Sequence, residues 1–482
     1  MLNKFAYAFR TLRNNLIAVA LLLFIAPACL AQTQFPDTPA GNQAKAWLEV
    51  FNAGDAEKHK EFLRKNAPSR LDRADREMGL REMTGGFDVK KIEESAPTKI
   101  VALLQERASD QFARLTIEID SSEQHQITRL ALQGTARPAE FAIPHLSESE
   151  LITATRKKMD EMAAADRFSG AVLVGKNGKT AFAQAYGLAD REKKTPNTLK
   201  TRFRLGSMNK MFTAVATLQL VQSGKLDLKA PFGNYLTDYP NKDVASKVTV
   251  EQLLMHTGGT GDIFGPEFDK KRLELKTLQD YVKLYGNRAL DFAPGSRWQY
   301  SNYGFLLLGV LVEKVSGQSY YDYVQEHIFK PAGMTATASE PEEQTVAERS
   351  VGYTRFTGPP LKPNTETLPY RGTSAGGGYS TVEDLFRFAT ALQTHKVLNA
   401  QYTEMLTTGK TDTPGGGKYA FGFQDATVNG TRCFGHGGGA PGMNGDLKIC
   451  PGPGYVIAVL ANMDPPAAGR VSDFITNRLP AK

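Results

Sequence analysis

The feature that most constrains the fold is a pair of strand-rich ends enclosing a helical middle. Two apolar runs, Ala171–Val174 and Ala181–Ala183, flank Asn177-Gly178. Asn-Gly between such runs is the strongest short-range hairpin signal, because both turn residues adopt positive φ. A second strand-rich group closes the chain at Gly445–Ile449 and Tyr455–Leu460. The pattern predicts an antiparallel sheet to which both ends of one domain contribute.

The segments between these ends carry helical signals instead. The expected helices are Met208–Gln222, Tyr303–Val315 and Glu383–Leu392, and a last one at Val471–Leu479. We therefore expect residues 148–482 to form one α+β domain, in which an antiparallel sheet is flanked by helices and a helical region lies beside it.

Residues 36–143 predict a second, smaller α+β domain. One helical face is formed by Ala44, Trp47, Leu48 and Phe51. Four strand-rich stretches with turn signals between them follow, at Phe87–Ile92, Lys99–Leu104, Phe112–Ile119 and Gln126–Leu132. The pattern resembles the cone-shaped α+β fold of the nuclear-transport-factor and polyketide-cyclase type. No motif accompanies it, and His59 and His125 are isolated, so the role of this domain cannot be read from the sequence.

Residues 1–31 predict a secretory signal peptide. A basic segment precedes the apolar run Leu16–Ile25, and Ala31 offers a small residue for cleavage. The run is well short of the roughly 20 residues that a membrane-spanning helix needs. We expect a periplasmic or secreted protein, with a buried N-terminal helix as the alternative.

The three cysteines bear on the same question. Cys29 follows Ala26-Pro27-Ala28, a poor relative of the lipoprotein box, so a membrane tether is expected only if Cys29 is lipidated. Cys433 and Cys450 form an even pair on neighbouring expected strands. A cross-strand disulfide and two buried thiols both fit this pattern.

Charge and composition exclude several classes of protein. Hydrophobic residues make up 41% and charged residues 23%, which excludes a disordered or many-pass membrane chain. Lys and Arg number 58 against 51 Asp and Glu, a net charge of +7 with no basic run, which argues against a nucleic-acid partner. The seven histidines are scattered, without His-Glu-x-x-His or another paired spacing, so we expect no metal and no organic cofactor.

A serine and a lysine at the start of an apolar helix suggest nucleophilic catalysis. Ser207-Met208-Asn209-Lys210 precedes an apolar run that continues to Val221. Residues three apart share a helix face, so Ser207 and Lys210 point the same way. A desolvated lysine can take the proton of a serine hydroxyl, and the N–H groups of a helix N-terminus can stabilise an oxyanion. The alternative is an ordinary N-cap serine beside a solvated lysine.

Two further segments favour the catalytic interpretation of Ser207 over the N-cap alternative. Tyr300-Ser301-Asn302 precedes the next apolar helix, and His436-Gly437-Gly438-Gly439 ends an expected strand. With Ser-x-x-Lys they resemble the serine β-lactamase and penicillin-binding-protein superfamily, whose sites combine these elements with a strand Lys-Thr-Gly. The second element has the form Tyr-x-Asn here. Together with Leu253–Gly259 and Gly376–Thr381, it is similar to the class C β-lactamase branch and its esterase, D-aminopeptidase and D,D-peptidase relatives. The resemblance covers about residues 148–482.

The resemblance implies four catalytic side chains. It places the nucleophile at Ser207 and its base at Lys210. Tyr300 takes the place of the phenol that passes a proton to the leaving group and later activates water, and Asn302 that of the amide that orients substrate and Lys210. A lysine ammonium next to Tyr300 would make its phenolate more accessible, since an unperturbed tyrosine titrates near 10.

The expected strand carries the remaining predicted site residues. The resemblance implies an oxyanion hole formed by the backbone N–H groups of Ser207 and Gly439, with His436 and Gly438 on the substrate-binding strand. Lactamases of this branch usually have lysine where this chain has His436. A histidine is mostly neutral at pH 7, so anchoring of a substrate carboxylate is weaker. We therefore expect a serine hydrolase that acts through an acyl-enzyme on a small-molecule or peptide substrate, an ester, amide or peptide.

Other functions fit parts of the sequence. A β-lactamase or a non-catalytic penicillin-recognising binder is the alternative within the resemblance. Gly372-Thr373-Ser374-Ala375-Gly376 matches the nucleophile elbow of α/β-hydrolases, but no buried strand precedes it and the His-Gly-Gly-Gly motif follows the serine instead of preceding it.

Overall fold

The structure, a computed structural model, describes residues 33–356 and 360–481. Two compact units can be distinguished by their internal contacts. The first comprises residues 33–74, 87–104 and 114–133, and the second residues 75–86, 105–113 and 134–481. The expected signal peptide and Cys29 lie outside the described residues, and the boundaries 36–143 and 148–482 stay predictions.

The first unit combines helices with a meander of strands. Its sheet has the order β1-β2-β3-β4, and the four strands are β1 (Phe87–Ala96), β2 (Lys99–Glu106), β3 (Phe112–Ile119) and β4 (Ile127–Thr135). The helices are α1 (Pro39–Ala53) and α2 (Ala56–Asn66). Thr38 caps α1 by accepting the Gly41 N–H, and Gly54 ends it with φ 73°. Trp47 and Phe51 stack at 5.0 Å in the core, so the four predicted strands and the apolar helix face are confirmed.

The second unit is built on an eight-stranded sheet with the order β13-β14-β15-β16-β17-β18-β5-β6. These strands are β5 (Gly170–Lys176), β6 (Lys179–Tyr186), β13 (Thr411–Asp412), β14 (Lys418–Tyr419), β15 (Gln424–Val428), β16 (Thr431–Ala440), β17 (Met443–Cys450) and β18 (Tyr455–Ala461). Asn177 and Gly178 form the predicted turn with φ 49° and 76°. The last strand pairs antiparallel with the first, Ile457 opposite Val174, which confirms a sheet completed by both ends of the domain.

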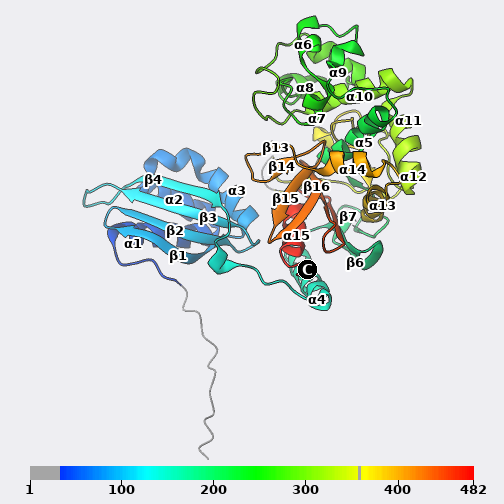
Figure 1. The fold of residues 1–482 in the computed structure, drawn as a ribbon. Helices are drawn as coiled ribbons and strands as arrows, with labels where there is room; N and C mark the ends of the chain where they lie inside the picture. The colour runs from blue at the N-terminus through cyan, green and yellow to red at the C-terminus, as the bar shows by residue number, and fades with distance from the viewer. Residues whose placement is uncertain (1–32, 357–359, 482) are drawn as a thin grey trace, which may run out of the picture. The chain divides into compact units, whose positions relative to one another are not determined.

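Short strands and many helices complete this unit. The short strands are β7 (Leu188–Asp190), β8 (Thr195–Pro196), β9 (Phe203–Arg204), β10 (Tyr353–Thr354), β11 (Lys362–Pro363) and β12 (Tyr379–Ser380). The helices are α3 (Ala74–Thr84), α4 (Glu148–Ala164), α5 (Asn209–Gln222), α6 (Lys242–Lys247), α7 (Val250–Leu254), α8 (Pro266–Lys271), α9 (Leu278–Tyr285), α10 (Asn302–Ser316), α11 (Tyr320–Val324), α12 (Lys330–Ala332), α13 (Val382–Gln393), α14 (Ala400–Thr407) and α15 (Ala467–Thr476). Figure 1 shows α6, α8 and α9 gathered at the end of this unit away from β15 and β16. Among the described helices, none has the length and apolar character to cross a bilayer.

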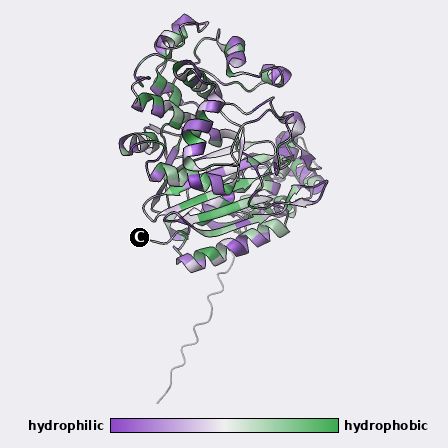
Figure 2. Ribbon diagram, turned by 90° about the vertical axis from the view of Figure 1, so that its right-hand side faces the viewer, coloured by the Kyte–Doolittle hydropathy of each residue, from purple (hydrophilic) through white to green (hydrophobic). Residues whose placement is uncertain are grey.

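Both faces of the central strands β17, β18 and β5 are buried, and Figure 2 shows green, hydrophobic strands in the sheet. Along β18, Val456, Ala458 and Leu460 join the core that contains α5, α10 and α13. The alternate residues Ile457 and Val459 join a second core with α4 and α15. A strand buried on both faces reads as a continuous apolar run, as the sequence of β18 does. The helices α5 and α10, which carry the candidate motifs, therefore pack on one known face of the sheet.

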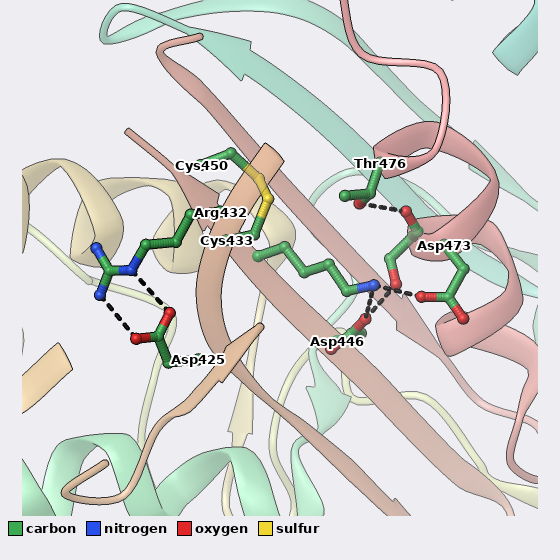
Figure 3. Close-up of a disulfide and its surroundings, with 9 residues drawn as sticks. Asp425, Arg432, Cys433, Asp446, Cys450, Asp473 and Thr476 are labelled. Atoms are coloured by element: carbon green, nitrogen blue, oxygen red, sulfur yellow. Dashed lines mark hydrogen bonds and ion pairs between the residues drawn. A yellow bond between two sulfur atoms is a disulfide. The ribbon is translucent and has the colours of Figure 1, made fainter. Parts of the chain in front are cut away.

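A disulfide links the neighbouring strands β16 and β17, and a buried charge cluster links β17 to α15 (Figure 3). Cys433 and Cys450 are bonded, with Cα atoms 4.2 Å apart, so the disulfide is the alternative that the structure adopts. On β17, the ammonium group of Lys448 contacts Asp446 and Asp473, the latter on α15. Burial raises the pKa of Asp446, and the nearby Lys448 opposes that shift.

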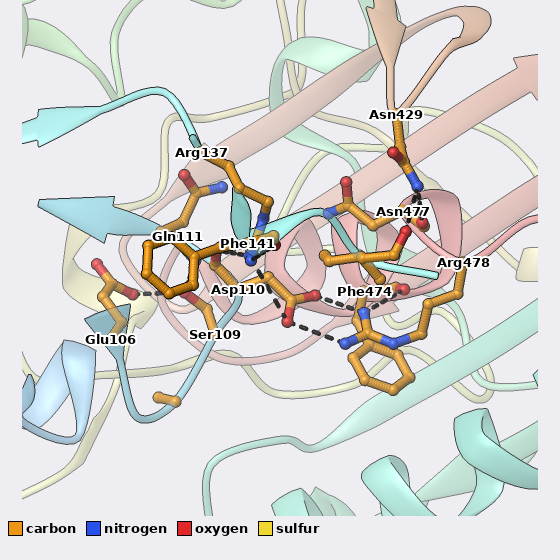
Figure 4. Close-up of polar contacts among 12 residues, drawn as sticks. Glu106, Ser109, Asp110, Gln111, Arg137, Phe141, Asn429, Phe474, Asn477 and Arg478 are labelled. Atoms are coloured by element: carbon orange, nitrogen blue, oxygen red, sulfur yellow. Dashed lines mark hydrogen bonds and ion pairs between the residues drawn. The ribbon is translucent and has the colours of Figure 1, made fainter. Parts of the chain in front are cut away.

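A second polar cluster fixes the turn between β2 and β3 within the same unit (Figure 4). Arg478 donates to both carboxylate oxygens of Asp110, at 2.5 and 3.0 Å, and Arg137 donates to the Asp110 carbonyl oxygen. Nearby, the side chain of Asn429 donates to the Asn477 carbonyl oxygen at 2.7 Å. The contacts of Asp110 tie residues 105–113 to residues 134–481 within this unit.

Candidate active site

Ser207 lies in a tight turn that joins β9 to α5. Gly206–Met208 form one turn of 3-10 helix directly before Asn209, so the serine precedes the α-helix and does not act as its N-cap. Gly206 has φ 54°, and a Cβ there would lie 2.9 Å from the Gly439 backbone nitrogen. Only a glycine allows the turn to approach β16 this closely.

Lys210 lies one helical turn beyond the serine and is completely buried. Its Nζ is 3.3 Å from Ser207 Oγ and 2.7 Å from Asn302 Oδ1, and it also donates to the Ala375 carbonyl oxygen. Burial lowers the pKa of Lys210 to about 7, against the opposing charge of Asp262. A large share of the amine is therefore neutral near pH 7, which is the state in which it accepts a proton.

Asn302 begins α10, where its neighbour Ser301 serves as the N-cap. The Asn302 amide is oriented at both ends. Its oxygen accepts from Lys210, and its nitrogen donates to both carboxylate oxygens of Asp262, at 3.0 and 3.1 Å. The carboxylate thus decides which end of the amide faces the lysine.

The ring of Tyr300 lies beside the same ammonium group. Lys210 Nζ is 4.7 Å from the ring centroid, and the phenol hydrogen-bonds with the Ser207 side chain. Burial raises the pKa of Tyr300, although the bond to Ser207 opposes this. The sequence suggested that a neighbouring ammonium makes the phenolate of Tyr300 accessible. In the structure desolvation outweighs that effect, because it keeps the phenol protonated and favours the neutral form of Lys210.

The strand β16 brings the remaining candidates to the turn. β15 pairs with β16 only as far as Gly435, so residues 436–440 have one edge without a strand partner on that side. A Cβ at Gly438 would lie 1.9 Å from the Leu205 carbonyl oxygen, whereas Gly439 is exposed. The bare backbone edge reaches Ser207 because these positions lack side chains.

His436 is buried and neutral. Its Nδ1 lies against the Gly437 carbonyl oxygen and its Nε2 lies 3.0 Å from the Tyr419 hydroxyl. Burial lowers the pKa of His436 to about 3, and the charge of Lys210 acts in the same direction. The side chain cannot present a cation to a substrate carboxylate at neutral pH.

Several residues of the site have no signal in the sequence. Asp262 and Ala375 lie in loops and contact the motif residues through one carboxylate and one carbonyl oxygen. Tyr419 precedes β16 and hydrogen-bonds His436. His256 adopts φ 60°, accepts the Ser301 N–H at 3.1 Å and has its ring 4.3 Å from that of Tyr300. Of these residues only His256 has a sequence signal: its place before Thr257-Gly258-Gly259 predicts a residue that supports a turn beside the site.

The competing serine is not accessible. Ser374 is 0% exposed, and a Cβ at Gly309 of α10 would lie 2.2 Å from its Oγ. Its carbonyl oxygen accepts from Thr213 of α5 at 2.6 Å. A buried serine beneath α10 cannot serve as an exposed nucleophile elbow.

The side chains of Ser207, Tyr300 and Asn302 thus converge around the buried amine of Lys210, on a fold of mixed helices and antiparallel strands, as in serine hydrolases of the transpeptidase type. The chain belongs to the beta-lactamase family, whose sequence model matches residues 155–482. Members of this family are hydrolases of the β-lactamase and penicillin-binding-protein type.

Individual relatives agree with that family. The chain is 31% identical over 278 residues to the "Putative penicillin-binding protein PbpX" of Bacillus subtilis, covering 57% of this chain and 68% of that one. It is 28% identical over 252 residues to the "Teichoic acid D-alanine hydrolase" of Staphylococcus aureus, covering 52% of this chain and only 60% of the relative. The crystal structure of a D-stereospecific amidohydrolase from Streptomyces sp. superimposes with a TM-score of 0.57 at 28% identity, over 68% of this chain and 98% of that one.

Proposed function

We propose that this protein is an exported serine hydrolase that forms a covalent acyl-enzyme on Ser207. The observation that carries the proposal is the buried Lys210 amine, which lies 3.3 Å from the serine oxygen and has its pKa lowered by burial to about 7. General-base activation of a hydroxyl requires a base whose pKa is close to the working pH.

The reaction proceeds in two halves. Neutral Lys210 takes the proton of Ser207 as the oxygen attacks the substrate carbonyl, and the backbone N–H groups of Ser207 and Gly439 stabilise the oxyanion. Tyr300 then gives its proton to the leaving group and recovers one from the Lys210 ammonium. A water molecule, deprotonated by the same pair, hydrolyses the acyl-enzyme. Asn302 keeps the lysine in position, while His436 and Gly438 line the substrate-binding edge of β16.

The substrate is an ester, amide or peptide, as for esterases, D-aminopeptidases or D,D-peptidases of the class C-related branch. Neutral His436 supports this choice, because a lysine at that position would supply a permanent cation for a β-lactam carboxylate. The names of two relatives, a D-alanine hydrolase and a D-stereospecific amidohydrolase, point the same way. The alternative is a β-lactamase or a non-catalytic penicillin-recognising binder.

Turnover of 4-nitrophenyl acetate and butyrate tests the proposal. Ser207→Ala should abolish turnover and labelling by a fluorophosphonate. Ser374→Ala is the matched control: its Oγ has no hydrogen-bond partner among the described residues, so the change removes no bond and should leave both readouts intact. Turnover that persists in Ser207→Ala, or a label on another residue, refutes the assignment, and an inert wild type favours the binder.

Export and the accessory domain are parts of the same proposal. We expect cleavage after Ala31, release to the periplasm or medium, and a tether only if Cys29 carries lipid. A disulfide between Cys433 and Cys450 supports an oxidising compartment. Residues 36–143 would form the nuclear-transport-factor-like domain. Mass spectrometry of the mature protein from a bacterial host tests cleavage, since a retained N-terminus contradicts it.

A further inference from the structure

A cavity of about 440 Å³ adjoins Tyr300 on the side of the β13–β15 strands. Its lining includes Trp298, Tyr300, Pro414, Gly415, Lys418 and Tyr419. A cavity of a few hundred Å³ is large enough for a ring-sized group, because ligand pockets typically measure roughly 300–1,000 Å³. Tyr300 belongs to both the cavity lining and the candidate catalytic group, so an occupant of the cavity touches that residue.

The walls of the cavity are of two kinds. On one side are aromatic rings: the centroid of Trp298 lies 6.4 Å from that of Tyr300 and 6.2 Å from that of Tyr419. The lining also includes the tip between β13 and β14, where a Cβ at Gly415 or Gly416 would meet no atom within 4 Å. A flat ring can therefore enter between aromatic faces and bare backbone, and such faces favour offset or edge-on ring contacts.

The charged side chains of the lining are already paired. The Lys418 ammonium lies 3.2 Å from Asp412, and the Asp425 carboxylate accepts from Arg432 at 2.8 Å. The hydroxyl of Tyr419, another lining residue, hydrogen-bonds neutral His436 at 3.0 Å. A carboxylate placed in the cavity would lose water without gaining an unpaired cation, which costs free energy.

We propose that this cavity binds the leaving group, and that it selects neutral aromatic or cyclic leaving groups over small or carboxylate-bearing ones. The inference rests on the proposed function, in which Tyr300 protonates the leaving group. That group must lie within hydrogen-bond reach of the phenol at the moment of bond cleavage. The atoms beyond it then extend into the space between Trp298 and the glycine tip.

The test compares acetate esters that share the acyl group: phenyl acetate, methyl acetate and 4-carboxyphenyl acetate. Each variant is measured against the wild type on the same ester, so that intrinsic reactivity cancels. Trp298→Ala removes an aromatic ring from the lining, and Gly415→Leu adds a side chain to the lining at a position where φ is not positive and the added Cβ is unobstructed. Both should lower kcat/KM for phenyl acetate about 10-fold, as loss of a well-filled pocket does, and change that for methyl acetate less than about twofold.

A matched control and a gain of function sharpen the test. Gly134→Leu makes the same substitution at another open glycine and should change neither ester. Asp412→Asn frees Lys418 from its partner and should raise kcat/KM for 4-carboxyphenyl acetate about two- to fivefold without improving phenyl acetate.

The outcomes separate the two proposals. Equal losses on phenyl and methyl acetate, or no loss in Trp298→Ala and Gly415→Leu, overturn the leaving-group pocket. If Ser207→Ala abolishes turnover in the same preparation, the proposed function survives that failure. Turnover that persists in Ser207→Ala overturns the function itself.

Discussion

Replacing Asp262 by asparagine tests whether a residue that never touches substrate tunes the proposed base. The side chain keeps its size, but the negative charge and one of the two acceptor oxygens are lost. In the wild type this carboxylate accepts from the Asn302 amide nitrogen at 3.0 and 3.1 Å, and so turns the amide oxygen towards Lys210. Asp262 is therefore a positioning residue that acts through Asn302.

The substitution has two effects, one on the plateau of kcat/KM and one on the pKa of Lys210. Hydrogen bonds to charged acceptors are stronger than neutral ones by about 1–2 kcal/mol, and an amide free to rotate offers Lys210 the wrong end. A loss of that size lowers the plateau of kcat/KM by about 5- to 30-fold. The carboxylate also raises the pKa of Lys210, in opposition to burial. Removing a unit charge that acts across the Asn302 amide is worth on the order of 2 kcal/mol at an effective dielectric of about 20, enough to move the titration by about one pH unit or more.

The sign of the shift decides the test. Activity needs the neutral amine, so kcat/KM in the wild type should rise with pH through about 7, where Lys210 loses its proton. Neutral His436 and His256, and a phenol whose pKa burial raises, leave Lys210 as the group of this cluster that titrates there.

Steady-state kinetics with 4-nitrophenyl acetate from pH 5 to 9 give the measurement. In Asp262→Asn the acid limb should move to lower pH while the plateau falls. Asp291→Asn neutralises a nearby carboxylate that contacts Gln299 at 3.4 Å, not Asn302, and should leave the limb in place. A limb that moves to higher pH in Asp262→Asn, or stays in place at full activity, refutes the reasoning.

The remaining predictions concern the base, the strand and the disulfide. Lys210→Ala should lower kcat by at least about 10²-fold, whereas His436→Ala should mainly change the ranking of ester and amide substrates; equal losses on all substrates contradict this division. Gly438→Ala should abolish activity, because its Cβ would lie 1.9 Å from Leu205, whereas Gly437→Ala, whose nearest contact would be at 3.5 Å, should stay active; kcat/KM of the two folded proteins checks this. Cys433→Ser opens the disulfide and should cost about 3 kcal/mol, seen as a lower Tm in calorimetry, and an unchanged Tm would show that the bond stabilises little.

The parts of the fold set by local chemistry could be predicted from the sequence. Asn177-Gly178 specifies its hairpin through positive φ, and the apolar runs of α5 and α10 specify buried helices. The boundaries were less accurate: α15 spans Ala467–Thr476, whereas the expected helix was Val471–Leu479. Beyond Thr476 the N–H groups of Arg478 and Leu479 bond the carbonyl oxygens three residues back, so the α-helical pattern ends there.

The surroundings of the candidate site could not be predicted in the same way. Ser207, Lys210, Tyr300 and Asn302 belong to ordered motifs, so their convergence could be expected from the resemblance. Asp262 and Tyr419 act through single contacts between loops or strands far apart in the chain, and no periodicity or spacing records such contacts. The protonation states also depend on burial, which a sequence does not show.

The contact of Gly206 with Gly439 also has a consequence for how the protein matures. The nucleophile turn and the strand beside it are separated by more than two hundred residues, and contacts so distant in the sequence are costly to close, so we expect this one to form later than the local helices. A newly made chain with a finished hairpin and finished helices would still be inert. Recovery of ester turnover during refolding should therefore lag behind recovery of the helical circular-dichroism signal, so turnover indicates when the fold is complete.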